Sequence, residues 1–310
     1  AKAGWIEGPS SGGPESRPDT QCVYPVKTAF LYAPSRVRGF RGTFVLSAVL
    51  AGLSLPLVLA GWAWAPLRWA GGVLAVYFLA NAALFVWREL RAPFVNGAND
   101  NATGVAAAVA AFEDLAATPG AGRVTLLLTG CEEVGARGAR AFLRAHPEAT
   151  ANLVLDVDLE TGSLKIAGPA GVPGPTGTLV INLDNVGRGT VHLATGEGML
   201  RYFPYRREGI EAAREAARTL GVNLPEVEYR LAYFDALPFV QARDRVVTFI
   251  ALEDGIIPNW HWRTDVLDNV DPAVPERAAE LAVETARAFL AAGHVPANAP
   301  VSPAARPAGV

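Results

Sequence analysis

Acidic residues beside glycine make up the part of this sequence that could do chemistry. Asp100 lies in residues 97–104 (Gly-Ala-Asn-Asp-Asn-Ala-Thr-Gly), a glycine-flanked turn that opens an alanine-rich run typical of a helix. A carboxylate in such a turn can bind a cation, while Thr103, or Asn101 through its side-chain oxygen, caps the helix. Taken alone, this pattern is more often an ordinary turn.

Two adjacent glutamates, Glu132 and Glu133, follow the apolar run 123–129. Neighbouring side chains at a strand-to-helix junction point in different directions. One can therefore ligate a metal while the other faces the water that the metal activates. For this pair alone, acids placed at a helix N-terminus for its dipole are the simpler reading.

Asp184 and His261 follow two further apolar runs, at 178–183 and 246–252. His261 lies between two tryptophans, and Asp265, four residues later, is placed to orient its ring. A lone histidine among aromatic residues usually belongs to a core. In α/β folds, however, function gathers at the carboxyl ends of the strands, which is where these residues fall.

The elements that must position these residues alternate between helices and apolar strands. This alternation predicts an α/β fold with a mostly parallel mixed sheet and helices on both faces. Residues 151–178 read as a short hairpin around 160–162 followed by a linker. We expect helices over 103–117, 135–146, 207–220 and 275–292, and strands over 123–129, 178–183, 228–232 and 246–252.

Two uncharged runs, 43–62 and 69–87, precede the α/β part. At ~1.5 Å per residue each is long enough to cross the ~30 Å hydrocarbon core of a bilayer. They predict a transmembrane helical hairpin, and the alternative is a buried helical hairpin in a soluble core. Tryptophans lie at the ends of the runs, where an interfacial belt would place them: Trp62, Trp64, Trp69 and Trp87.

Basic residues flank this hairpin on its outer sides and are scarce in its turn, which contains only Arg68. Such residues favour the cytoplasmic side of a membrane, so we expect the catalytic part to be cytoplasmic. No basic stretch followed by an apolar core begins the chain, so we expect no signal peptide. The flanking residues are Arg36, Arg38 and Arg41 before the hairpin and Arg88 and Arg91 after it.

Composition agrees with one globular domain and a small membrane part. The 310 residues are 51% hydrophobic and 18% charged, with a mean hydropathy of +0.22, which is too apolar for an ordinary soluble domain. The net charge of −3 and the lack of a basic aromatic patch argue against a nucleic-acid partner. Cys22 and Cys131 make no disulfide framework, which agrees with a reducing compartment.

Five motifs, in this order, resemble peptidase family M28, a family of zinc metallopeptidases, and in particular its bacterial relatives with a membrane hairpin. The resemblance covers roughly residues 95–292. It implies a phosphorylase/hydrolase-like zinc exopeptidase fold with an inserted transmembrane hairpin. The motifs are 97–104, 129–135 (Thr-Gly-Cys-Glu-Glu-Val-Gly), 181–187 (Ile-Asn-Leu-Asp-Asn-Val-Gly), 234–239 (Phe-Asp-Ala-Leu-Pro-Phe), and His261 with Asp265.

The resemblance implies a Zn2+ site of one or two ions and an aminopeptidase-like activity on peptides. Asp100 would bridge two zincs, Glu133 and His261 would complete the first site, and Asp184 would serve the second. Asp184 has rivals in Asp156 and Asp158, but only its own context matches the family. The remaining acids implied are Glu132, as the general base that deprotonates a metal-activated water, and Asp235 and Asp265, as supporting acids.

The N-terminal motif departs from the family pattern. A His-x-Asp motif is expected before the bridging aspartate, but here the counterpart is Arg17-Pro18-Asp19. Asp19 fits the supporting acid, whereas Arg17 occupies the ligand position and cannot bind zinc. Two alternatives therefore stay open: a catalytically impaired or truncated relative, and single-zinc chemistry like that of the glutaminyl cyclases.

These expectations divide the chain into four parts. A loop-rich segment at 1–42 precedes the transmembrane hairpin at 43–88. The M28-like catalytic domain follows at 95–292. A disordered tail is expected at 293–310, because that segment is rich in proline and alanine.

Overall fold

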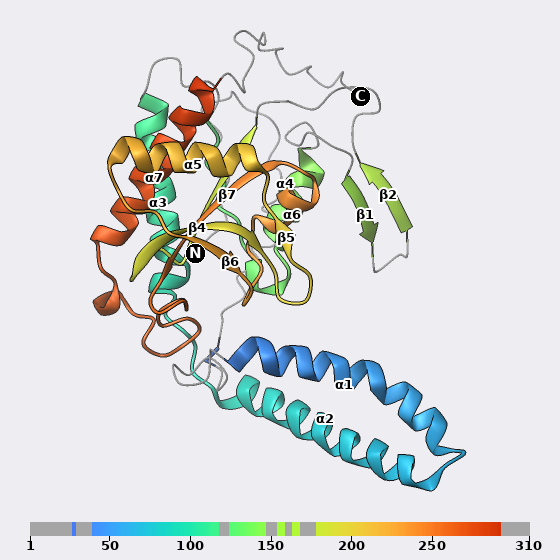
Figure 1. The fold of residues 1–310 in the computed structure, drawn as a ribbon. Coiled ribbons are helices and arrows are strands. Elements are labelled where there is room, and N and C mark those ends of the chain that lie inside the picture. The colour runs from blue at the N-terminus through green and yellow to red at the C-terminus, as the bar shows by residue number, and fades with distance from the viewer. Residues whose placement is uncertain are drawn as a thin grey trace, which may run out of the picture.

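A computed structural model describes the protein over residues 27–28, 39–117, 124–146, 154–158, 163–167 and 178–292. Figure 1 shows an α/β unit from which a long helical hairpin projects. Most of segment 1–42, the linker after residue 167 and the tail at 293–310 lie outside the described residues, so the expectations for them stay predictions.

The hairpin consists of α1 (Phe40–Gly61) and α2 (Ala65–Arg91), of 22 and 27 residues, as the two uncharged runs predict. Among their described residues only Gly61 is buried, so the described part of the fold does not enclose the hairpin as a soluble core would. Both helices are long and apolar enough to cross a membrane. The polar groups between them are satisfied locally, as in the 2.7 Å hydrogen bond between Ser47 Oγ and Tyr77 OH.

The main sheet is mixed and is centred on β7 (Arg245–Leu252). β3 (Leu179–Asp184) pairs with β7 in parallel, and β4 (Thr190–Glu197) pairs with its other edge in antiparallel orientation. Beyond β4 lie β5 (Phe203–Pro204), which is antiparallel to it, and β6 (Glu226–Tyr229), which is parallel to it. The predicted α/β class with a mixed sheet is thus confirmed. Two of the four pairings described for this sheet are antiparallel, however, so its described part is not mostly parallel as expected.

Helices cover the sheet on both sides (Figure 1). On one side α5 (Arg207–Leu220) packs on α7 (Ala273–Ala291), which in turn contacts α3 (Gly104–Ala117). On the other side α4 (Arg137–Ala145) lies against the short helix α6 (Leu237–Gln241). Four of these helices match the predicted ranges to within about three residues.

Two strand predictions were wrong in part. No strand is assigned within residues 124–131; Val124 and Leu127 pack against the core, but no described strand pairs with this segment. The strand expected at 228–232 begins two residues earlier, as β6. β4 was not predicted, because His192, Thr195 and Gly196 interrupt the apolar run that marks a buried strand.

The short hairpin expected within 151–178 is confirmed. β1 (Val154–Asp158) and β2 (Ser163–Ala167) form a separate two-stranded antiparallel sheet. Asp156 and Asp158 lie on β1, whereas Asp184 ends β3 of the main sheet.

The centre of the core depends on β7, whose residues from Val246 onward are all buried. We predict that Phe249→Ala lowers the free energy of unfolding by about 3–5 kcal/mol, because Phe249 is fully buried and its removal leaves a cavity. Urea unfolding followed by circular dichroism measures this loss. The control Leu267→Ala removes a side chain that is 74% exposed, and it should change stability by less than about 0.5 kcal/mol.

Candidate metal centre

Three of the predicted metal-binding residues lie together in the structure. His261 Nε2 is 3.0 Å from Asp100 Oδ2 and 2.6 Å from Glu133 Oε1. One ligand atom from each residue lies within 4.8 Å of the others, and this is a group that could hold a metal ion. The three residues come from the turn before α3, from the 3-10 turn Glu132–Val134, and from the loop after β7.

The Asp100 turn ends in the predicted helix cap. Asn101 Oδ1 accepts a hydrogen bond from the backbone N–H of Gly104, the first residue of α3, at 3.2 Å. The Thr103 hydroxyl instead donates to the carbonyl of Asn99 at 3.0 Å. Of the two possible caps, the asparagine is the one used.

Asn99 is buried, and it joins the turn to two other loops. Its Nδ2 donates to the carbonyl of Pro258 at 2.9 Å, and its Oδ1 accepts from the N–H of Gly187 at 2.7 Å. A Cβ at position 187 would lie 2.6 Å from Asn99 Oδ1, so only glycine allows this approach. Sequence reasoning missed Asn99, although an amide on each side of Asp100 was a signal for it.

Asp265 holds the turn as well. Its carboxylate accepts hydrogen bonds from the backbone N–H groups of Asn99, at 2.6 Å, and of Asp100, at 3.3 Å. The sequence predicts Asp265 as the acid that orients the His261 ring. The hydrogen bonds place its carboxylate at the backbone of the Asp100 turn, where two backbone N–H groups point towards it.

Asp184 lies beside Asp100 at the end of β3. Asn185 Nδ2 is 2.8 Å from Asp184 Oδ1 and 3.4 Å from Asp100 Oδ1, so one amide connects both carboxylates. Burial, followed by the charge of Asp100, raises the pKa of Asp184 well above its usual range. Asp184 is thus close to the group of three ligands without being part of it.

Glu132 and Asp235 lie with Asp100, Glu133 and Asp184 in one group of carboxylates, which we call the acidic cluster. Burial, followed by the charges of Glu133 and Asp184, raises the pKa of Glu132 to about 11. Burial also raises the pKa of Asp235 to about 6, although a hydrogen bond from the Thr129 hydroxyl to Asp235 Oδ2 opposes the shift. The other oxygen, Oδ1, is buried with no hydrogen-bond partner.

His261 is the one base among these acids. Its burial disfavours the charged ring, but hydrogen bonds to Asp100 and Glu133 outweigh burial and raise its pKa to about 10. Carboxylate oxygens and one imidazole nitrogen are a donor set that zinc accepts. Burial and then the neighbouring carboxylates raise the pKa values of Glu132 and Asp184, and the positive charge of a divalent ion would offset both effects. The residues therefore fit the metal.

A second buried acid, Glu197 of β4, was not predicted. Its carboxylate accepts hydrogen bonds from the Tyr205 hydroxyl at 2.9 Å and from the backbone N–H of Phe234 at 2.5 Å. Burial raises the pKa of Glu197 to about 8. By holding Phe234, this residue fixes the segment that begins the Asp235 turn, and its place in an unpredicted strand explains why it was missed.

A protein-family model matches the part of the chain that contains these ligands. The model of peptidase family M28 matches residues 84–286, about two thirds of the chain. The chain belongs to peptidase family M28. The resemblance drawn from the five motifs is confirmed, and membership together with the group of three ligands supports the expected zinc cofactor.

Solved structures show only a weak likeness to this M28 chain. No curated protein matches it. It is similar to the zinc aminopeptidase of Bacillus subtilis, with 20% identity and a TM-score of 0.46, over 62% of this chain and 42% of that one. An aminopeptidase from Aneurinibacillus sp. strain AM-1 has 18% identity and a TM-score of 0.42, over 62% of this chain and 39% of that one. The LapA aminopeptidase of Legionella pneumophila has 15% identity and a TM-score of 0.44, over 63% of this chain and 47% of that one. The M28 chain thus spans less than half the length of these enzymes.

The remaining predicted residues of the M28 chain lie elsewhere. Arg17 and Asp19 fall outside the described residues, so the departure of the N-terminal motif stays a prediction. Cys131, directly before Glu132, is disulfide-bonded, which removes the support that the cysteines gave to a reducing compartment.

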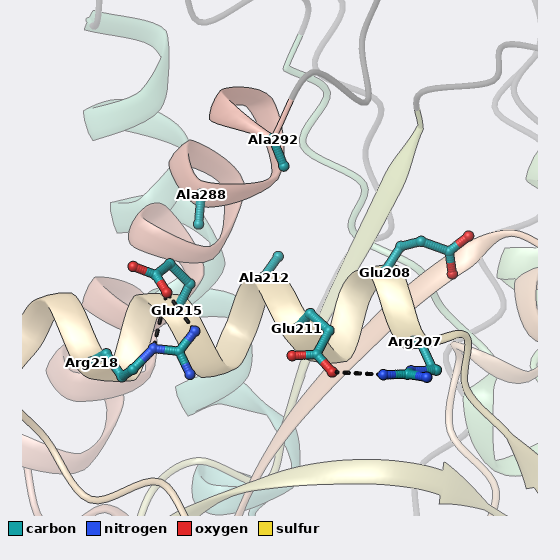
Figure 2. Close-up of a pocket in the computed structure, with 8 residues that line it drawn as sticks. All are labelled: Arg207, Glu208, Glu211, Ala212, Glu215, Arg218, Ala288 and Ala292. Carbon is teal, nitrogen blue, oxygen red and sulfur yellow. Dashed lines mark hydrogen bonds and ion pairs between the residues drawn. The ribbon is translucent and has the colours of Figure 1, made fainter.

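A hollow lies between α5 and the end of α7 (Figure 2), and no residue of the acidic cluster lines it. Its charged side chains come from α5. Arg207 pairs with Glu211 at 3.6 Å and Arg218 pairs with Glu215, while Glu208 pairs with Arg206 at 2.8 Å, outside the lining. Ala288 and Ala292 form its other wall. Because its charges are already paired and no predicted site residue lines it, we assign it no part in the chemistry.

Removing one acid from the cluster is expected to stabilise the metal-free protein. A glutamate with a pKa near 4.5 when unfolded and about 11 when folded must take up a proton on folding at pH 7. This uptake costs up to about 3 kcal/mol. We predict that Glu132→Gln removes the cost and raises the Tm of chelator-treated protein by up to about 10 °C at pH 7.

The stability difference between Glu132→Gln and wild type should depend on pH. Wild-type stability falls as the pH rises above the unfolded pKa, so the advantage of Glu132→Gln should grow with pH and shrink by pH 5. Thermal unfolding at pH 5, 6 and 7 measures it. The control Glu113→Gln, on the exposed side of α3, should match wild type throughout. A Glu132→Gln protein no more stable than wild type at pH 7 would contradict the prediction.

Proposed function

We propose that the chain is a zinc-dependent exopeptidase of the aminopeptidase type, with a peptide as substrate. The observation that carries this proposal is the meeting of Asp100, Glu133 and His261, with Glu132 next to them in one partly buried acidic cluster. Membership in peptidase family M28 supports hydrolysis of a peptide bond. The zinc aminopeptidases with a similar fold support the choice of metal and of reaction.

In this proposal Asp100, Glu133 and His261 hold one zinc, and Asp184 with Asp100 offers oxygens to a second. When bound, the metal supplies positive charge that polarises the scissile carbonyl and makes water a better nucleophile. Asn185 keeps the carboxylates of Asp100 and Asp184 in a fixed relation. Asp265 fixes the backbone from which Asp100 projects.

Glu132 is the proposed general base. Its carboxylate accepts the proton of the attacking water and passes it to the leaving amine, so the carbonyl carbon gains an oxygen and the peptide nitrogen leaves as an amine. The high pKa of Glu132 depends on burial and on the charges of Glu133 and Asp184. Neutralising those two neighbours lowers that pKa towards the range that a base requires.

The zinc count separates this proposal from its alternatives. About two zincs per chain supports the peptidase with both metals. One zinc agrees with a site lacking the histidine that Arg17 replaces, and it leaves single-zinc cyclase-like chemistry open. No zinc under zinc-replete conditions would rule out every catalytic reading and leave an impaired relative.

We predict that Glu132→Gln lowers kcat for aminoacyl anilides by about 10²–10⁴-fold, which is the usual contribution of a general base. Zinc content should stay as in wild type, because Glu132 is not one of the three ligands. Steady-state kinetics and metal analysis of the same preparation measure both quantities. Equal activity in the two proteins would remove Glu132 as the base.

We also propose that α1 and α2 span a bilayer as a hairpin and that the peptidase part lies in the cytoplasm. Their length, composition and exposed side chains support the first statement. Arginines on the outer flanks, among them Arg41, Arg88 and Arg91, support the second. The disulfide at Cys131 favours the opposite, oxidising compartment.

A topology reporter therefore decides the orientation. We predict that a reporter fused after Val310 is active only in its cytoplasmic form, because arginine resists translocation. A fusion within the turn between α1 and α2, at Trp64, should report the other side of the membrane. An external signal from the Val310 fusion would reverse the proposed orientation.

A further inference from the structure

The ligand candidate His261 lies in a loop whose backbone is strained. Both Asn259, with φ 62°, and His261, with φ 50°, occupy the left-handed region that side chains other than glycine rarely adopt. Such conformations persist only where the surrounding structure holds them. The position of the imidazole therefore depends on what packs against this loop.

Trp260 is the residue that connects the loop to its surroundings. It is buried, at 7% exposed, and its ring lies 5.0 Å from the His261 ring. Phe40 meets the Trp260 ring edge-to-face, with centroids 6.0 Å apart and the planes at 80°. Phe40 is the first residue of α1, so two successive ring contacts lead from the hairpin to the metal ligand.

The first turn of α1 is also docked at a second point. Arg41 Nε donates to the carbonyl of Met199 at 3.4 Å, and Phe40 packs against the main core. Further along the helix most side chains are exposed; Val49, for example, is 52% exposed. The hairpin thus contacts the domain through its base, beside the candidate metal centre.

We infer that Phe40 is a positioning residue of the metal centre and that it acts on His261 through Trp260. The hairpin is then part of the scaffold that preorganises the ligand set, in addition to any anchoring role. Loss of the Phe40 ring frees one side of Trp260, and the loop can leave the left-handed conformation that directs the imidazole towards Asp100 and Glu133. This inference rests on the proposed function, because it takes His261 as a zinc ligand.

The test compares zinc binding in full-length, detergent-solubilised variants. Phe40→Ala is expected to weaken zinc affinity about ten-fold, the usual effect of losing a residue that orients a ligand. Phe40→Leu keeps apolar volume without the ring and should fall between Phe40→Ala and wild type. The matched control is Val49→Ala, which trims an exposed side chain of the same helix and should bind zinc as wild type does.

Affinity is measured by competition with a zinc chelator, and unfolding of the metal-free proteins is measured in parallel. The inference expects a larger change in zinc affinity than in metal-free stability. If Phe40→Ala does not fold, the zinc affinity of Phe40→Leu is compared with that of wild type instead, and the inference expects it to be weaker.

Two negative results have different meanings. If wild type binds zinc and both Phe40 variants bind it equally well, the inference is wrong and the proposed function stands. If wild type itself binds no zinc, the proposed function fails first.

Discussion

The crowding of carboxylates in one poorly solvated cluster is the constraint on which this structure depends. Glu132, Asp184 and Asp235 all have raised pKa values, and burial is the leading cause each time. One imidazole, that of His261, is the only base placed among them by the described residues. A fold tolerates such a group when something compensates for it, and a divalent cation is the compensation that the donor set suits.

Neutral amides hold the acids in place without adding charge. Asn99, Asn101 and Asn185 each donate and accept, so they can bind carboxylates, carbonyls and backbone N–H groups at once. A lysine or arginine in their place would neutralise the acids and compete with a cation. The asparagines therefore give the ligands rigid geometry while leaving the field of the site negative.

Much of the site could be predicted because acids and one histidine follow apolar runs in a recognisable order. Asp100, Glu133 and His261 were found in this way, and so was the Asn101 cap. Contacts set by tertiary packing could not be predicted. The amide partners of Asp265, the packing of Phe40 on Trp260, and β4 with its polar interruptions depend on which segments meet in space. The apolar run at 123–129 shows the converse, since Val124 and Leu127 pack partly buried against the core although no strand is assigned in the described part of this run.

The turn around Asp100 is built from segments far apart in the chain. Asn99 is separated by 159 residues from Pro258 and by 166 from Asp265, its partners in the folded protein. During synthesis this turn leaves the ribosome long before those partners exist, and closing so long a loop is entropically costly. A nascent chain lacking the region after β7 has neither the imidazole nor the groups that hold the turn. Capture of a metal by these three ligands would thus require that the chain has been made at least as far as His261 and Asp265.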